Sequence, residues 1–142
     1  MVNSKQKGSA GERALKSKFH EELGFYLVRN LSQAAKGGYD ASIRKFDDQD
    51  APVVIPFAIE FKRDEKMTTE KMWEQAITQT TQTCFIPVVI YKRNYKPWRF
   101  IMSLDAARLI PDGKFTASFD QTIEMGESLF FHIAREWLNL EN

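Results

Sequence analysis

The sequence lacks the features that mark secreted and membrane proteins. It has one cysteine, Cys84, so no disulfide can form within the chain. Its longest uninterrupted apolar run is nine residues, 51–59, which is too short to span a bilayer. The first eight residues are mostly polar and provide no apolar core for a signal peptide. We therefore expect a cytoplasmic protein that has no membrane partner.

The chain also has little net charge, +1 over 142 residues, but the two signs are unevenly distributed. Residues 1–45 carry nine Lys and Arg against four Asp and Glu, whereas residues 105–142 carry three against seven. A basic half is compatible with a polyanionic partner such as nucleic acid. On charge alone, an ordinary solvated surface is the simpler interpretation.

What the chain does contain is typical of one folded domain. A length of 142 residues fits a single domain, and 13% aromatic residues argue against disorder. Hydrophobic periodicity predicts helices over 8–23, 68–83 and 126–140. Strands are predicted over 25–31, 39–46, 53–62, 86–91 and 98–104. This order predicts an α/β fold over residues 1–142, with a mixed central sheet flanked by helices.

The last helix is unusually apolar. A stripe of apolar residues is expected to face the sheet: Leu129, Ile133, Trp137 and Leu140. Phe130 and Phe131 widen the apolar surface beyond that stripe. A helix of this kind often packs on both its own sheet and a partner subunit, so this helix and Trp98 are candidates for a dimer interface.

Carboxylates and a lysine gather at the ends of two predicted strands. Glu60 and Lys62 are two residues apart on a strand, so their side chains point to the same face. Pairing of the predicted hairpin brings Asp40 near Glu60. Two carboxylates with an adjacent lysine can hold a divalent cation and orient a water molecule. A plain salt bridge between Glu60 and Lys62 is the simpler interpretation of the triplet alone.

A third acid, Glu12, lies on the apolar stripe of the first predicted helix, three residues before Leu15. A carboxylate on that stripe needs a partner, and a metal cluster would supply one. The alternative is that an acid in the first turn simply interacts favourably with the helix dipole. Neither histidine has a second ligand at metal-binding spacing, so both are left out of the candidate site.

Several motifs in order make the chain resemble the PD-(D/E)xK nuclease superfamily, and within it the archaeal-type Holliday junction resolvases, which also occur in phages. The motifs are Lys7-Gly8 with Glu12-Arg13, Gly24-Phe25 with Val28-Arg29, Asp40, Glu60-Phe61-Lys62, Gln75, and the apolar segments 87–92 and 98–101. The resemblance covers about residues 5–104 and leaves 105–142 as a C-terminal extension with a helix. It implies a restriction-endonuclease-like fold.

The resemblance also implies roles for individual residues. Asp40, Glu60 and the main-chain carbonyl of Phe61 would bind Mg²⁺, with Mn²⁺ as a substitute. Lys62 would support the attacking water, Glu12 would add a ligand, and Gln75 would help to order the site. Ser32 would lie in the loop that approaches the scissile phosphate. The candidates for contacts with DNA phosphates are Lys5, Lys7, Arg13, Arg29, Lys36 and Arg99.

The resemblance therefore predicts a metal-dependent endonuclease that is selective for four-way junctions and acts as a homodimer. Two alternatives stay open. One is a nuclease of the same chemistry that acts on ordinary duplex or single-stranded DNA. The other is a catalytically silent DNA-binding module on the same fold, which the intact set of candidate catalytic residues argues against. Tyr39 stands where the superfamily signature has proline.

Overall fold

The computed structural model of the protein describes residues 4–31, 38–81 and 83–141. Its helices are α1 (Ser4–Leu23), α3 (Thr69–Thr80), α4 (Leu104–Ala107), the short 3-10 helix η1 (Phe119–Gln121) and α5 (Glu127–Glu141). Its strands are β1 (Tyr26–Arg29), β2 (Ala41–Arg44), β3 (Val53–Lys62), β4 (Ile86–Tyr91), β5 (Arg99–Ser103) and β6 (Thr122–Met125).

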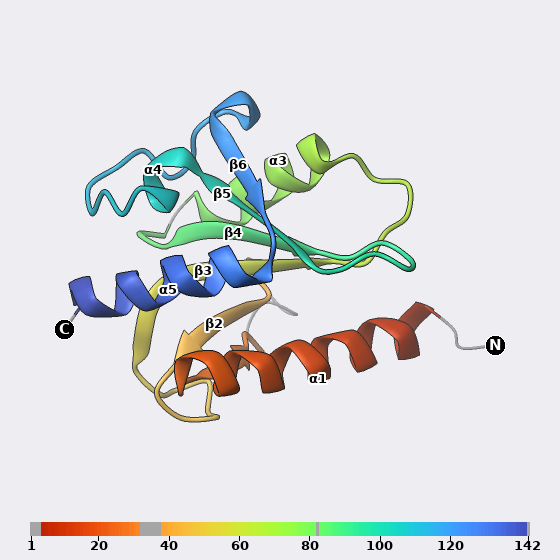
Figure 1. Cartoon of the computed structure of the whole chain (residues 1–142), viewed down its shortest axis with the longest axis horizontal. Coiled ribbons are helices and arrows are strands. Elements are labelled where there is room, and N and C mark those ends of the chain that lie inside the picture. The colour runs from red at the N-terminus through yellow and green to blue at the C-terminus, as the bar shows by residue number, and fades with distance from the viewer. Residues whose placement is uncertain (1–3, 32–37, 82, 142) are drawn as a thin grey trace.

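The six strands form one mixed sheet in the order β1-β2-β3-β4-β5-β6. Only β3 and β4 are parallel, and α3 connects them; the other neighbours are antiparallel. Because β3 and β4 are parallel, both end at the same edge of the sheet, which is the right-hand edge in Figure 1. The predicted α/β fold with a mixed sheet flanked by helices is confirmed.

Helices cover both faces of the sheet, so the central strands are buried on both sides (Figure 1). On one face, α1 and α5 lie against a large core to which β3 contributes Ile55, Phe57 and Ile59. Phe130 stacks on Phe100 of β5, with ring centroids 4.3 Å apart. On the other face, α3 packs a smaller core around the fully buried Trp73.

The predicted elements differ from the structure at several places, and the strands predicted over 25–31 and 39–46 are shorter, at Tyr26–Arg29 and Ala41–Arg44. Helix α1 begins at Ser4 rather than at residue 8. Strand β6 was not predicted, because four residues at a sheet edge leave a weak periodic signal. Residues 105–142 add this strand and α5 to the sheet.

Among the described residues, no helix is long and apolar enough to cross a bilayer.

The predicted buried stripe of α5 is partly wrong. Leu129 is 46% exposed and Leu140 is 50% exposed, whereas Phe130 and Phe131 are buried. The helix turns its two phenylalanines toward the sheet because large aromatic rings bury more apolar surface than leucines do. Trp137 is also buried and donates its indole N–H to the Ala106 carbonyl at 2.9 Å. These aromatics fill the chain's own core, so their apolarity gives no reason to expect a partner subunit.

Candidate active site

The antiparallel pairing of β2 with β3 brings the first two carboxylates together. Ala41 pairs with Ile59, which places Asp40 opposite Glu60. The Asp40 N–H donates to the Ile59 carbonyl at 2.9 Å, and the Phe61 N–H donates to Asp40 Oδ2 at 2.8 Å. The second bond ties the Asp40 carboxylate to the backbone of the segment that carries Glu60. Residues 21 positions apart in the sequence therefore share one end of the sheet.

Lys62 follows Glu60 on the same strand face, as the sequence predicted. Its Nζ donates to Gln75 Oε1 of α3 at 2.7 Å. The simpler interpretation, a salt bridge between Glu60 and Lys62, is not borne out, since no ion pair joins these two described residues. The ammonium is held by a neutral amide oxygen and keeps its full charge for other groups.

The electrostatics of this carboxylate pair are unusual. Glu60 is 4% exposed, and burial together with the neighbouring Asp40 charge raises its pKa to about 8, against the smaller opposing effect of Lys62. Burial also raises the pKa of Asp40, although the Phe61 N–H, Lys62 and Arg29 partly oppose this. A buried and a half-buried carboxylate that repel each other need a cation to become fully ionised together. Hard oxygen ligands of this kind suit Mg²⁺, so the residues present fit a divalent metal.

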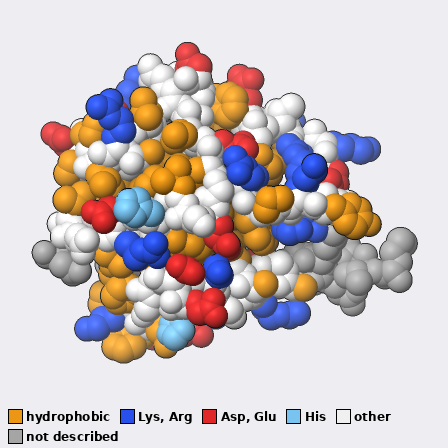
Figure 2. All heavy atoms as spheres, in the orientation of Figure 1, with side chains coloured by type: hydrophobic (Ala, Val, Ile, Leu, Met, Phe, Trp, Pro, Cys, Tyr) orange, Lys and Arg blue, Asp and Glu red, His pale blue; other side chains and the backbone are white. Residues whose placement is uncertain are grey.

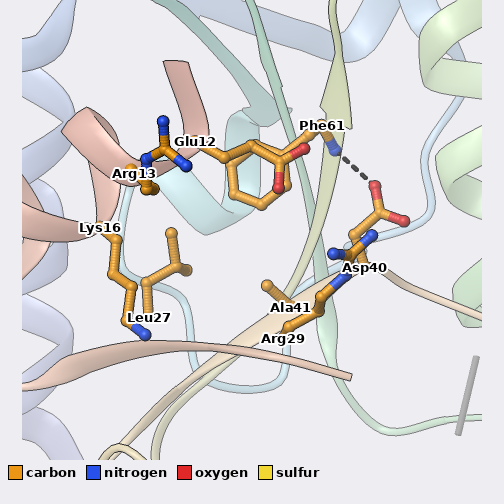
Figure 3. Close-up of a pocket in the computed structure, with 8 residues that line it drawn as sticks. All are labelled: Glu12, Arg13, Lys16, Leu27, Arg29, Asp40, Ala41 and Phe61. Carbon is orange, nitrogen blue, oxygen red and sulfur yellow. Dashed lines mark hydrogen bonds between the residues drawn. The ribbon is translucent and has the colours of Figure 1, made fainter. Parts of the chain in front are cut away.

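A cavity of about 270 Å³ opens beside Asp40 (Figure 3). Its lining comes from α1, β1, the start of β2 and the end of β3: Glu12, Arg13, Lys16, Leu27, Arg29, Asp40, Ala41 and Phe61. Figure 3 shows the Arg29 guanidinium beside the Asp40 carboxylate. The cavity therefore combines carboxylates with three basic side chains, which suits an anionic ligand that arrives with a cation.

Glu12 lies in the wall of this cavity, half-buried on α1. Burial raises its pKa, Arg29 lowers it, and the Asp40 charge raises it. The Asp40 charge therefore acts on Glu12 across the cavity. In the described part of the chain, however, no three Asp, Glu, His or Cys side chains are arranged to hold a metal ion together. The structure brings Glu12 to the site without a preformed cage of three acidic ligands, and its role as a ligand stays a prediction.

The predicted DNA contacts divide into three groups. Arg13 and Arg29 line the cavity, as a phosphate-binding role requires. Arg99 does not: its Nε forms an ion pair with Glu124 Oε2 at 3.0 Å, so its charge is already balanced. Lys5 and Lys7 belong to α1, but their side chains lie outside the described part of the chain, as do Ser32 and Lys36 entirely.

Two features of the site were missed in the sequence. Gln79 of α3 accepts a 2.6 Å hydrogen bond from the Gly38 N–H and so ties the helix to the chain just before Asp40. The second feature is a basic cluster at the ends of the parallel strands, where Lys62-Arg63 and Lys92-Arg93 meet. Basic side chains also gather on the right-hand part of the face shown in Figure 2. The signal was a Lys-Arg pair at the end of each of two apolar strands, Lys62-Arg63 and Lys92-Arg93.

Comparisons with known proteins give one family. No curated protein sequence matches the chain. Its structure is similar to that of Hjc, a Holliday junction resolvase from the archaeal hyperthermophile Archaeoglobus fulgidus, with a TM-score of 0.43 and 18% sequence identity over 87% of each chain. The family described as "Phage putative PDDEXK endonuclease" matches residues 3–128, which include all three candidate carboxylates, Lys62 and Gln75. Because the match covers most of the chain, the protein belongs to this PDDEXK endonuclease family.

Proposed function

We propose that this protein is a Mg²⁺-dependent endonuclease that hydrolyses DNA phosphodiester bonds and prefers four-way junctions. The observation that carries the chemistry is the hydrogen bond from the Phe61 N–H to Asp40 Oδ2. It fixes Asp40 opposite the buried Glu60, with Lys62 on the same strand. A pair of repelling carboxylates beside a lysine is the arrangement that metal-assisted phosphodiester hydrolysis needs.

Each residue of the site has a role that follows from its position. Asp40, Glu60 and the Phe61 carbonyl would hold Mg²⁺, which when bound polarises a phosphoryl oxygen and activates water. Lys62 would orient the attacking water or offset the charge that develops on the phosphate. Gln75 holds the Lys62 ammonium in place through its 2.7 Å bond. Glu12, in the cavity wall, would complete the ligand set directly or through a water molecule.

The basic residues that line the cavity also suggest where the DNA backbone would bind. Arg13 and Arg29 line it beside Asp40, so a phosphate next to the scissile bond could be bound by charge-assisted hydrogen bonds there, whereas Lys16 is paired with Asp47 at 2.9 Å. These contacts carry no base information and would position the backbone only. Selectivity for a junction would then come from the shape of the DNA rather than from its sequence.

We further propose that the active form is a two-fold homodimer. Symmetric cutting of a four-way junction needs two sites in one particle, and two-fold dimers are the commonest closed assembly. Two sites at a fixed separation would engage two backbones of a junction, whereas a linear duplex would fill only one. The second contact is then a tethered binding event that is worth up to about 10²–10⁴ in avidity.

The test is a competition titration of a labelled four-way junction against unlabelled linear duplex of the same sequence, at several salt concentrations. Cleavage is followed in parallel with Mg²⁺, with Mn²⁺ and with EDTA, and Asp40→Asn is the inactive control. We expect affinity for every DNA to fall with salt, because counterion release drives binding. The preference for the junction is expected to persist at salt concentrations where linear duplex no longer binds.

Three outcomes separate the alternatives. If linear duplex competes as well as unlabelled junction but is cleaved, the protein is a general nuclease of the same chemistry. If all DNAs bind and none is cleaved with either metal, it is a silent DNA-binding module. A mass near that of one 16.5 kDa chain by light scattering, with and without junction, would overturn the homodimer.

A further inference from the structure

One exposed side chain has no role in the fold or in the site described above. Tyr95 lies in the turn between β4 and β5, and its side chain is fully exposed, at 101%. No aromatic ring or cation in the described part of the chain contacts its ring. Its backbone has φ +62°, a left-handed conformation that bulky residues rarely adopt. Glycine or asparagine would fit that backbone with less strain.

The turn that carries Tyr95 is held firmly against the loop between β3 and α3. Arg93 donates from Nη1 to the Asp64 carbonyl and from Nη2 to the Met67 carbonyl, each at 2.8 Å. The Asn94 N–H donates to Glu65 Oε1 at 2.6 Å. These bonds fix the residues on the N-terminal side of Tyr95 to a second segment of the chain. The Tyr95 ring therefore extends into solvent from a turn whose preceding residues are fixed by hydrogen bonds.

The surroundings of this turn are strongly basic. The segments 62–67 and 92–96 contain six basic residues against two acidic ones. Both acids accept hydrogen bonds from backbone N–H groups of the two segments: Asp64 Oδ1 accepts from the Lys66 and Met67 N–H groups, and Glu65 accepts from the Asn94 N–H. Lys66, in the loop between β3 and α3, and Lys96, in the turn, are both exposed. An aromatic ring among unbalanced cations is the composition of a surface that binds single-stranded nucleic acid.

The turn also lies at the same sheet edge as the candidate active site. The Lys92 N–H donates to the Lys62 carbonyl at 3.1 Å, and Tyr95 follows three residues later. Tyr95 therefore lies three residues beyond the backbone hydrogen bond that joins the ends of β3 and β4.

From this placement we propose that Tyr95 stacks on an unpaired DNA base near the scissile phosphate. The inference rests on the proposed function, because it takes DNA as the substrate. Within an intact duplex, neighbouring base pairs cover both faces of each base. The ring can stack only where a face is open, at a branch point, a flap or an end. Tyr95 would thus select DNA that contains an unpaired base beside a duplex.

The experiment uses a duplex with one splayed arm that carries 2-aminopurine at the first unpaired position, and the matched intact duplex. Binding is measured in EDTA, so that no DNA is cleaved. Tyr95→Gly removes the ring and relieves the left-handed strain, and Tyr95→Trp keeps a stacking surface. Phe46→Ala is the matched control, since Phe46 is also exposed, at 58%, but is followed in the chain by Asp47, Asp48 and Asp50.

We expect Tyr95→Gly to weaken binding of the splayed DNA by between about 5-fold and about 150-fold, the usual range for loss of one stacked base. The same variant should bind the intact duplex as the wild type does and should leave 2-aminopurine emission unquenched. Tyr95→Trp should restore both signals, and Phe46→Ala should change neither. Because the substitution relieves strain, the Tm of Tyr95→Gly should not fall.

Other outcomes overturn the inference. Equal affinity of Tyr95→Gly and wild type for the splayed DNA would remove the stacking role, and an equal loss for both DNAs would reduce Tyr95 to a general contact. If Tyr95→Gly has a lower Tm, Tyr95→Asn replaces it as the ring-free variant under the same criteria. A wild type that cleaves no DNA with Mg²⁺ refutes the proposed function. A wild type that cleaves, with a selectivity unchanged in Tyr95→Gly, refutes the stacking alone.

Discussion

Lys62 Nζ lies 2.7 Å from Gln75 Oε1, so the last residue of β3 is hydrogen-bonded to the middle of α3. The amide oxygen fixes the direction of the ammonium and carries no charge that would neutralise it. A carboxylate at the same place would neutralise it. A flexible lysine side chain is thereby held at the sheet edge where Asp40 and Glu60 lie. The helix that crosses from β3 to β4 is thus also a support for the candidate active site.

Loss of this support should slow catalysis without affecting DNA binding. We expect Gln75→Ala to lower the single-turnover cleavage rate about 10- to 100-fold, the range seen when a residue that orients a metal-site group is removed. Gln75→Glu should also be slow, because it neutralises Lys62. Thr78→Ala, an exposed change on the same helix, is the control and should cleave at the wild-type rate. Wild-type rates for Gln75→Ala would contradict the positioning role.

The residues that carry the chemistry should behave as one unit. Asp40→Asn, Glu60→Gln and Lys62→Ala are each expected to abolish cleavage of labelled DNA with Mg²⁺ while binding is retained. Double variants should be little worse than single ones, since groups that act together are strongly non-additive. Glu74→Gln, an exposed change on α3, should retain activity. Substantial turnover by Asp40→Asn would contradict the assignment of the site.

The raised pKa of Glu60 predicts how stability depends on pH in the absence of metal. Its folded-state pKa is about 8 against an ordinary value of 4.5. Between these values the folded protein binds more protons than the unfolded chain, so the free energy of unfolding falls as pH rises through this window. Glu60→Gln removes this titration and should have a higher Tm than the wild type at pH 8, with little difference at pH 4.

Thermal melts in EDTA across this pH range test the prediction. Glu74→Gln serves as the control, because it removes an exposed carboxylate from the neighbouring helix, and its melting curve should follow that of the wild type. If the Tm of Glu60→Gln and the Tm of the wild type change with pH in the same way, Glu60 is not the group that binds the extra proton in the folded protein.

The same proton should be displaced when a metal ion binds. Ligand carboxylates must be ionised, so Mg²⁺ affinity should rise about tenfold per pH unit as pH approaches the Glu60 pKa of about 8. Calorimetric titration at pH 6.5 and pH 7.5, in two buffers of different ionisation enthalpy, should reveal close to one proton released. Asp40→Asn should bind Mg²⁺ weakly at both pH values. An affinity that does not change with pH would contradict the coupling.

The sequence by itself determined most of the longer elements and the identity of the catalytic candidates. The apolar run that ends in Glu60-Phe61-Lys62 predicted a strand with two charged residues on one face, and β3 has the predicted bounds, Val53–Lys62. The helix predicted from residue 68 is capped by Thr68, whose side chain accepts from the Lys71 N–H at 3.2 Å. Local periodicity and capping decide such features, because the residues involved are close together in the chain.

Tertiary structure alone decided which distant groups meet. The bond from the Phe61 N–H to Asp40, the neutral partner of Lys62 and the basic ends of two parallel strands each depend on strand order and register. It also decided that Phe130 and Phe131 fill the chain's own core and that Arg99 pairs with Glu124. Composition and spacing carry no information about these outcomes, because each depends on which surfaces the sheet and its helices bring into contact.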